Sequence, residues 1–360
     1  MRLWGLDRSD RRLVDPGPPQ AARLPYPDGW FALATGAELK PGTVLNRRLT
    51  GEDVVLYRTA SGRPRAVRPY CPHLGAHLGH GATVRGENIR CPFHHFRFGP
   101  DGVCVATGYG TPPPKARLAT LPCRELDGLV FVWRHARHEP PSWEIEALPP
   151  EGFPEPYCVL LTRGDHPQDV MENLVDYGHF LPVHGYRLEV VSPPRFEGTR
   201  LETANRIRTG RAAAAWKISA ASPVSRVVMQ GLGVVRVQVD SPQFRFRARG
   251  WFCVTPTEPC RVEIRMAVAL RPAGTGHGRL VRSLVALAAR PYTWLAARDN
   301  AEDVPIWENK THLAHPRLAK GDGPIGTFRR WAEQFYSEPL GSGAKPRPDE
   351  GPPAGRGRGG

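Results

Sequence analysis

The sequence predicts an α+β fold in which a small antiparallel β domain precedes a larger domain whose antiparallel sheet grips helices. The first part of the chain contains short β-like runs separated by Gly, Pro and Asp, namely WFALAT, TVLNRRL, DVVLYRT and SGRPRAV. Longer β-like runs and then helical patterns fill the C-terminal half. A chain of 360 residues is also long enough for two domains.

Changes in composition predict the domain boundaries. Residues 1–24 are rich in Arg, Asp and Pro and predict an extended lead-in to a first domain at residues 25–135. Residues 136–156 are rich in Pro and Glu without apolar periodicity, which predicts a linker. The second domain then covers residues 157–340, and the Gly- and Pro-rich residues 341–360 predict a disordered tail.

Composition argues against several classes of protein. No stretch approaches the ~20 apolar residues of a membrane span, and the first residues lack the apolar core of a secretory signal. We therefore expect a cytoplasmic protein without a membrane span. Seven cysteines, an odd number, argue against a disulfide framework. The net charge of +14 comes from dispersed arginines without a basic helix, so we expect no nucleic-acid partner.

Two pairs of Cys and His stand out in the first domain. Cys71 and His73 form a C-x-H pair, Cys91 and His94 form a C-x-x-H pair, and 17 residues separate His73 from Cys91. A hairpin at residues 82–90 can bring the two loops together. Such a set can hold zinc in a closed site. It can also hold a Rieske [2Fe-2S] cluster, in which two Cys bind one iron and two His bind the other.

Three features favour the cluster over zinc. Each of the two Cys is followed by Pro, and the first loop is Gly-rich, which lets the backbone wrap the sulfides. No helical pattern follows the second pair, as it would in a zinc finger. We therefore predict a [2Fe-2S] cluster held by Cys71, His73, Cys91 and His94.

The second domain offers a carboxylate and two imidazoles within one short stretch, at Asp176, His179 and His184. Two His and one carboxylate on one face of Fe(II) leave the other face open for O₂ and substrate. Asp176 and His179 are three residues apart, so we expect them on one face of a helix. Between His179 and His184 lies Pro182, which supplies the kink that can turn His184 back toward His179.

The rest of the second domain predicts one large antiparallel sheet followed by helices. The β-like runs lie at residues 157–162, 201–209, 213–220, 233–240, 243–254 and 261–270. Residues 278–311 read as helical, and residues 322–336 predict a turn and a short amphipathic helix. In the first of these helical segments, core spacing is found for Leu280, Leu284 and Leu287.

Three acidic residues in the same helical segment can supply a carboxylate to the iron. They are Asp299, Glu302 and Asp303, and periodicity alone does not choose among them.

The two motifs together resemble those of the Rieske non-haem iron oxygenases. The chain carries C-P-H-x17-C-P-F-H and, about 80 residues later, N-x-x-D-x-x-H-x4-H. The resemblance covers residues 25–336. Within that family, PYPDGWFALATGAELKPG, DHPQDVMENLVDYGHF and EDVPIWENKTHLAHPRL are similar to the branch of cholesterol 7-desaturases and 3-ketosteroid 9α-hydroxylases. The second cluster loop reads CPFHHF, where much of the family has Gly-Trp after the histidine.

The resemblance implies roles for the matched residues. His179 and His184 would bind the mononuclear Fe(II), and the match of EDVPIW selects Asp303 as the third ligand. Asp176 would then bridge a cluster histidine of one subunit to His179 of the next subunit in a homotrimer. Asn173 would lie beside Asp176 near the iron and complete the predicted catalytic set.

The resemblance also implies an activity. We expect desaturation or hydroxylation of an unactivated C–H bond of a sterol or steroid with O₂, with cholesterol 7-desaturation favoured. Electrons would come from NAD(P)H through a ferredoxin or a flavin reductase. The alternatives are a 3-ketosteroid 9α-hydroxylase, a Rieske oxygenase for a non-steroid substrate, and, in another class, a Rieske electron carrier that does not need the mononuclear iron ligands.

Overall fold

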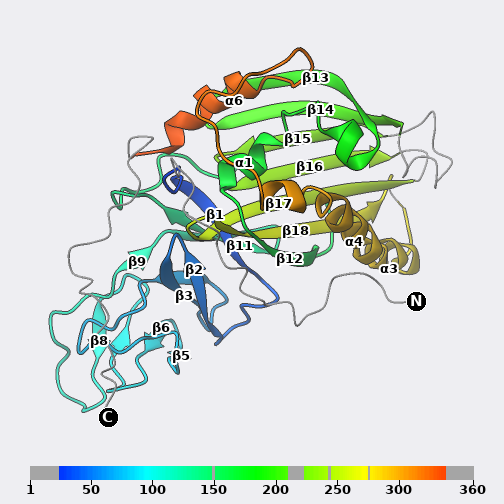
Figure 1. Cartoon of the computed structure of the whole chain (residues 1–360). Coiled ribbons are helices and arrows are strands. Elements are labelled where there is room, and N and C mark those ends of the chain that lie inside the picture. The colour runs from blue at the N-terminus through cyan, green and yellow to red at the C-terminus, as the bar shows by residue number, and fades with distance from the viewer. Residues whose placement is uncertain (1–23, 148–150, 210–222, 242–244, 275, 338–360) are drawn as a thin grey trace, which may run out of the picture.

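A computed structural model describes residues 24–147, 151–209, 223–241, 245–274 and 276–337 (Figure 1). The expected tail at 341–360 and the β-like run at 213–220 lie outside the described residues, as does all of the lead-in except residue 24. The described part contains a group of small sheets at one end and one large sheet with helices on its face at the other.

The N-terminal part consists of three small antiparallel sheets, as the short β-like runs predict. Their strand orders are β1-β11-β10, β2-β3-β4-β9 and β5-β6-β7-β8. The strands are β1 (Gly29–Thr35), β2 (Val44–Leu49), β3 (Glu52–Arg58), β4 (Pro64–Val67), β5 (Thr83–Arg85), β6 (Asn88–Arg90), β7 (Arg97–Phe98), β8 (Cys104–Ala106), β9 (Thr120–Leu121), β10 (Cys123–Leu126) and β11 (Leu129–Arg134).

The C-terminal part is built on one seven-stranded antiparallel sheet with the order β12-β18-β17-β16-β15-β14-β13. Its strands are β12 (Tyr157–Arg163), β13 (Arg187–Glu197), β14 (Arg200–Thr209), β15 (Ser225–Gln230), β16 (Val234–Ser241), β17 (Phe246–Glu258) and β18 (Arg261–Pro272). The large antiparallel sheet predicted from the sequence is therefore confirmed.

Strand β13 is an element that the sequence did not predict. Its interior contains Pro193 and Pro194, and Pro cannot donate a hydrogen bond to a neighbouring strand. Among the described strands it lies at the edge of the sheet and pairs with β14 alone, through a register that shifts near the two prolines. An edge position tolerates Pro because one side of the strand needs no partner.

Helices cover one face of the large sheet (Figure 1). They are α1 (Pro167–Glu172), α3 (Arg279–Leu287), α4 (Ala289–Asn300), α5 (Val304–Trp307), α6 (Ile325–Ala332), the π-helix η1 (Phe180–His184) and the 3₁₀ helix η3 (Glu333–Phe335). Buried side chains from α1, α4 and α6 share one core with the sheet, including Met171, Ala297 and Phe328. This layer holds the segments that carry the predicted iron ligands.

The two parts of the chain pack against each other through β1. The buried guanidinium of Arg265 on β18 donates to the carbonyl oxygen of Ala32 at 2.9 Å, and the Thr255 hydroxyl donates to the same oxygen at 2.8 Å. The predicted linker is also packed, because Ile145 is buried and the carbonyl of Trp143 accepts a hydrogen bond from the Trp30 indole. The linker is thus part of the interface.

One sequence expectation about the helices is wrong. Leu280, Leu284 and Leu287 have core spacing on α3, but 72%, 58% and 58% of their surfaces are exposed. Among the described residues, none of α3 is buried. The stripe therefore faces outward, away from the core.

Candidate functional site

The first candidate site is formed by the two loops that flank the β5-β6 hairpin, as the sequence predicts. In the first loop, the backbone N–H of Cys71 donates to the carbonyl of Ala76, and the N–H of Gly75 donates back to the carbonyl of Cys71, both at 2.9 Å. In the second loop, the N–H of Cys91 donates to the carbonyl of Phe96 at 2.9 Å. Each loop is therefore closed by its own backbone before any metal binds.

The four predicted cluster ligands form two pairs across the loops, Cys71 with Cys91 and His73 with His94. Both cysteines are buried and reduced, and burial, with the nearby Cys91 thiol, raises the pKa of Cys71 to about 11. The rings of His73 and His94 lie 4.8 Å apart, centroid to centroid. The buried Nδ1 of His94 has no hydrogen-bond partner among the described residues. Two buried thiols and an unpaired imidazole nitrogen fit a metal group that takes protons off thiols when it binds.

The CPFHHF loop packs against the first loop through an aromatic ring. Phe96 is buried and stacks on the His73 imidazole at 4.2 Å with an interplanar angle of 8°. Gly108 lies against the back of the second loop, where a Cβ would overlap the carbonyl oxygen of His94. The second loop therefore has fixed packing on both sides.

The second candidate site begins at a π-helix. Helix α1 ends at Glu172, so Asp176 and His179 lie in the following turn, and the expectation that they share a helix face is wrong. Residues 180–184 form η1, in which the N–H of Gly185 also bonds to the carbonyl of Phe180, five residues earlier. A π-helix completes a turn in more residues than an α-helix. The five-residue spacing thus returns His184 to the side of His179 without relying on a proline kink alone.

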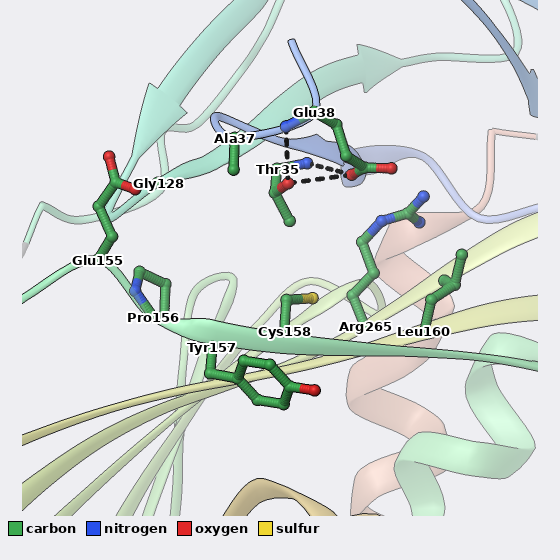
Figure 2. A pocket seen from close by; sticks show the side chains of 10 residues that line it. All are labelled: Thr35, Ala37, Glu38, Gly128, Glu155, Pro156, Tyr157, Cys158, Leu160 and Arg265. Carbon is green, nitrogen blue, oxygen red and sulfur yellow. Dashed lines mark hydrogen bonds between the residues drawn. The ribbon is translucent and has the colours of Figure 1, made fainter. Parts of the chain in front are cut away.

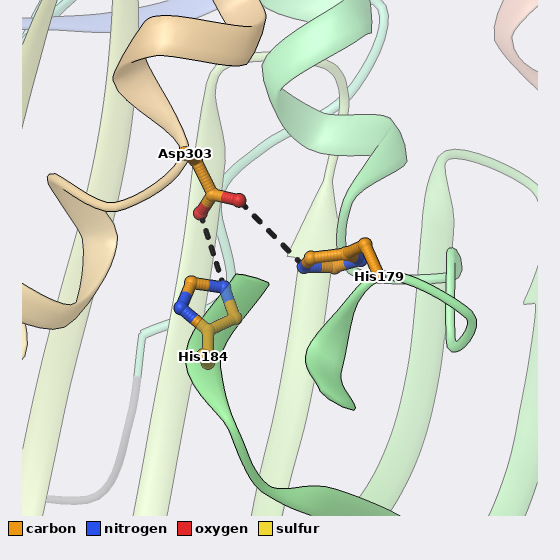
Figure 3. A group of neighbouring side chains, drawn as sticks. All are labelled: His179, His184 and Asp303. Carbon is orange, nitrogen blue, oxygen red and sulfur yellow. Dashed lines mark ion pairs between the residues drawn. The ribbon is translucent and has the colours of Figure 1, made fainter. Parts of the chain in front are cut away.

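The two histidines meet a carboxylate from a distant segment (Figure 3). Nε2 of His184 lies 3.4 Å from Oδ2 of Asp303, and Nε2 of His179 lies 3.8 Å from Oδ1 of Asp303. One donor atom from each of the three side chains lies within 4.8 Å of the others. Two imidazoles and one carboxylate at this spacing fit the facial donor set of non-haem Fe(II).

Periodicity alone did not choose among the three acidic residues, and the family resemblance selected Asp303. Among the described residues, Asp303 is the one of the three that approaches both histidines. The Asp303 side chain is 5% exposed, against 45% for Asp299 and 44% for Glu302. Asp299 and Glu302 face Nδ1 of His184, whereas Asp303 faces Nε2. The Oε2 atom of Glu302 lies 3.4 Å from Nδ1. Burial works to lower the pKa of His184, but the three carboxylates more than offset it and raise the pKa.

Asp176 contacts His179 mainly through its backbone. The Nδ1–H of His179 donates to the Asp176 carbonyl at 2.6 Å, and the other ring nitrogen, Nε2, faces Asp303. The Asp176 carboxylate accepts the N–H of Gly178 at 3.1 Å and lies 3.7 Å from Nδ1 of His179. Burial works to raise the pKa of Asp176, and the contacts with His179 and Gly178 lower it overall.

Asn173 lies at the C-terminal cap of α1, where its backbone N–H bonds to the carbonyl of Met171. It is partly buried. Its role near the iron stays a prediction.

Sequence reasoning missed a buried polar group under α1. Asp169 accepts a hydrogen bond from His312 at 3.0 Å, and Glu172 accepts two from Arg329, at 2.6 and 2.9 Å. Asp165, just before the helix, is buried as well. The sequence shows acidic residues in this segment but does not show that the short helix is buried. The structure shows that all described residues of the helix are buried. These pairs anchor the helix that leads into the iron-binding turn.

A separate groove of about 300 Å³ lies between the N-terminal part and β12 (Figure 2). It is open and includes none of the predicted ligand residues. Two of its charged groups already have partners, since Glu38 accepts from Thr35 and Arg265 donates to the backbone of β1. We therefore assign no chemistry to it.

Comparison with protein families decides between the readings of the motifs. Residues 29–122 match the Rieske [2Fe-2S] domain, and residues 132–336 match the 3-ketosteroid 9α-hydroxylase C-terminal domain. The chain belongs to the Rieske oxygenases. As an oxygenase of this family it uses a Rieske cluster, a mononuclear non-haem iron and O₂, so the prediction of a cluster rather than zinc is confirmed.

Relatives of this Rieske oxygenase include enzymes from animals and bacteria. It is 30% identical to cholesterol 7-desaturase nvd 1 of Ciona intestinalis, over 93% of this chain and 73% of the relative. It is 31% identical to cholesterol 7-desaturase nvd of Bombyx mori, over 92% and 73%. It is 27% identical to the probable 3-ketosteroid-9-alpha-monooxygenase oxygenase component of Rhodococcus rhodochrous, over 93% and 85%.

Solved structures share the fold at lower identity. NdmA of Pseudomonas putida CBB5 with caffeine matches with a TM-score of 0.63 and 19% identity, over 84% of this chain and 89% of that one. Dicamba monooxygenase bound to dicamba matches with a TM-score of 0.58 and 18% identity, over 86% and 96%. The two-part α+β architecture predicted from the sequence is therefore confirmed. None of the described helices has the length and apolar character needed to cross a bilayer.

Proposed function

We propose that this Rieske oxygenase desaturates or hydroxylates an unactivated C–H bond of a sterol or steroid, with cholesterol 7-desaturation favoured. The observation that carries the proposal is that its desaturase and 9-alpha-monooxygenase relatives are both named for steroid substrates. A 3-ketosteroid is the second candidate, since the C-terminal family match bears that name.

The proposed ligands follow from the donor geometry. Cys71, His73, Cys91 and His94 would hold the [2Fe-2S] cluster, in a Rieske domain at residues 25–135. His179, His184 and Asp303 would hold the Fe(II), in a catalytic domain at residues 157–340. The pairing of the two histidine rings and the unpaired Nδ1 of His94 support the cluster assignment. The buried carboxylate of Asp303 between two imidazoles supports the iron assignment.

The protein's own contribution to the reaction is to hold and orient the metal-binding donors. When bound, the Fe(II) supplies O₂ activation and the abstraction of hydrogen from carbon. The Asp176 carbonyl keeps the proton of His179 on Nδ1 and thereby presents Nε2 to the metal. Asp303 balances part of the positive charge from a buried position. No side chain needs to act as a nucleophile.

We further propose a homotrimer in which the cluster of one subunit faces the iron of the next. The cluster tip supports this, because four large apolar side chains around His73 and His94 are more than half exposed: Tyr70, Leu74, Phe93 and Tyr109. The half-buried Asp176 carboxylate would link a partner's His94 to His179 and give a hydrogen-bonded path between subunits. A ferredoxin or flavin reductase would supply the electrons. Seven free cysteines support the cytoplasm as the compartment.

The activity is tested with anaerobically reconstituted protein, a surrogate reductase and NADPH. Cholesterol, a 3-ketosteroid and an aromatic acid are supplied in parallel, and products are identified by mass spectrometry. We expect O₂-dependent conversion of a steroid and no conversion by His179→Ala, whose reduced cluster keeps its electron paramagnetic resonance signal. Conversion of the aromatic acid alone would overturn the steroid assignment. Electron transfer without any product, in wild type and variant alike, would favour an electron carrier.

The trimer is tested by mixing two inactive variants. Asp303→Ala keeps the cluster and Cys91→Ser keeps the iron site, so a mixed trimer places an intact cluster beside an intact iron site. We expect co-expression of the two to restore a fraction of the wild-type turnover. A monomeric mass by light scattering, or no recovery from a confirmed mixed trimer, would contradict the arrangement.

A further inference from the structure

The outward-facing stripe on α3 and α4 has no role in the site described above. Leu280, Leu284 and Leu287 are four and three residues apart, so they lie on one face of α3. Two large apolar residues of α4 are also exposed, Trp294 at 38% and Leu295 at 51%. Figure 1 shows α3 at the outer edge of the molecule, beside one end of the large sheet.

The opposite face of the helix pair is what attaches it to the protein. Ala289 of α4 is buried in a core with Val268 and Leu270 of β18, and Val285 of α3 packs against that core. Thr293 and Ala297 continue the buried face of α4. The exposed leucines are therefore surplus to the fold, and an apolar stripe of this kind marks an interaction surface.

The charge of the segment indicates the kind of partner. Residues 278–298 contain four arginines and no acidic residue. All four arginines are exposed, and they are Arg279, Arg282, Arg290 and Arg298. A helix with leucines on one face and exposed arginines away from that face, followed by a helix with an exposed Trp, has the composition of a helix pair that lies in a membrane interface. The anionic headgroups would pair with the arginines while the leucines enter the acyl region.

A second copy of the chain fits this surface less well. The proposed trimer joins unlike surfaces, the cluster tip of one subunit and the iron site of the next. Pairing of the stripe with the same stripe of another copy would bring the same four arginines from each copy together, in a chain that already carries a net charge of +14. An anionic bilayer instead neutralises them.

We propose that the α3–α4 surface docks on an anionic phospholipid bilayer and takes the sterol substrate from it. The reason for docking rests on the proposed sterol substrate, whereas the docking itself does not. Helix α4 ends three residues before Asp303. The docked helix pair is thus continuous with the segment that carries the proposed iron ligand.

Docking is tested by flotation of the full-length, reconstituted protein with sterol-free vesicles. We expect binding to vesicles of 70% phosphatidylcholine and 30% phosphatidylglycerol, weaker binding to pure phosphatidylcholine, and loss of the difference at high salt. Leu280→Ser with Leu284→Ser should lower binding by about tenfold or more, because two apolar anchors are lost. Arg279→Gln with Arg282→Gln should remove the preference for the anionic vesicles.

A matched control uses two exposed leucines elsewhere, Leu313→Ser with Leu318→Ser, which should bind vesicles as wild type does. An equal loss of vesicle binding in the Leu313 and Leu318 variant, or no flotation of the wild type, would overturn the proposal. A changed mass by light scattering for Leu280→Ser with Leu284→Ser would assign the stripe to a second copy instead. Circular dichroism melting curves confirm that each variant is folded.

Separate experimental outcomes refute the docking proposal and the proposed function. Delivery of sterol in cyclodextrin bypasses the membrane, so the Leu280 and Leu284 variant should turn over this sterol normally but convert vesicle-embedded sterol several-fold more slowly. Flotation without any sterol product would refute the function and leave docking intact. Normal turnover from cyclodextrin without flotation would refute docking alone.

Discussion

The cluster loops and the mononuclear iron site are assembled over very different stretches of chain. The four proposed cluster ligands lie between positions 71 and 94, on two loops joined by one hairpin and closed by their own backbone hydrogen bonds. The proposed iron ligands lie at positions 179, 184 and 303. Their meeting depends on a π-helix, on α4 and on the core beneath both. Damage to the first site should therefore be local, while the second should respond to changes far along the chain.

Removing one ligand from each site gives the largest contrast. Asp303→Ala should abolish mononuclear iron binding and lower turnover by more than about 100-fold, since loss of an outer partner alone costs roughly 10- to 100-fold. The cluster should keep its visible and electron paramagnetic resonance spectra. Cys91→Ser should instead remove the cluster and its spectra and keep the mononuclear iron. Metal analysis and the two kinds of spectra check both variants. Loss of both centres in either variant would show that the two sites fold together.

Two glycines sharpen the comparison. Gly323 has φ of +85°, and a Cβ there would overlap the carbonyl of Val175, at the turn before Asp176. Gly323→Ala should destabilise the protein by about 2–4 kcal/mol and lower Fe(II) affinity, although position 323 is remote in sequence from that turn. Gly108→Ala should cost about 1–3 kcal/mol and lower cluster content instead.

Urea unfolding and metal content measure both glycine variants. Gly164→Ala is the control, because a Cβ there meets only ordinary contacts, at 3.7 Å or more. Equal iron loss in all three variants would contradict the assignment of Gly323 to the iron-binding turn.

The carboxylates beyond His184 should have a smaller effect. Glu302→Gln removes a charge 3.4 Å from Nδ1 of His184 and should weaken Fe(II) binding about 10-fold, the low end of the range for such partners. The exposure of Glu302 to water limits the loss. Calorimetric titration of the apo-site under argon measures it, with the exposed Glu308→Gln as control. A loss as large as that of Asp303→Ala would make Glu302 a ligand.

A buried acid just before α1, Asp165, should make the stability of the protein depend on pH. Burial, with the nearby Asp169, raises the pKa of Asp165 to about 8. The folded state then keeps a proton that the unfolded chain releases near pH 4, so Asp165 lowers stability progressively as the pH rises from about 4 to 8. Asp165→Asn should raise the unfolding free energy at pH 8 by about 1–3 kcal/mol and leave it unchanged near pH 4. Thermal unfolding at both pH values checks this, and a gain that is equal at both would refute the raised pKa.

The sequence alone determined the chemistry and most of the fold. The Cys and His spacing predicted a Rieske cluster, and the paired motifs predicted a mononuclear iron, because metal ligands must have fixed types and short spacings. The number and spacing of β-like runs separated by turn residues predicted the two-part α+β architecture and the large antiparallel sheet. These signals are local, so one sequence is enough to read them.

The tertiary structure decided what depends on distant contacts. Helical periodicity left Asp299, Glu302 and Asp303 equivalent, and only the family resemblance selected Asp303. The tertiary structure separates them physically, because Asp303 is buried and the other two are exposed to water. It placed His184 through a π-helix, which has no sequence signal of its own. It also turned Leu280, Leu284 and Leu287 outward, because helical spacing shows that residues share a face and does not show which face meets the core.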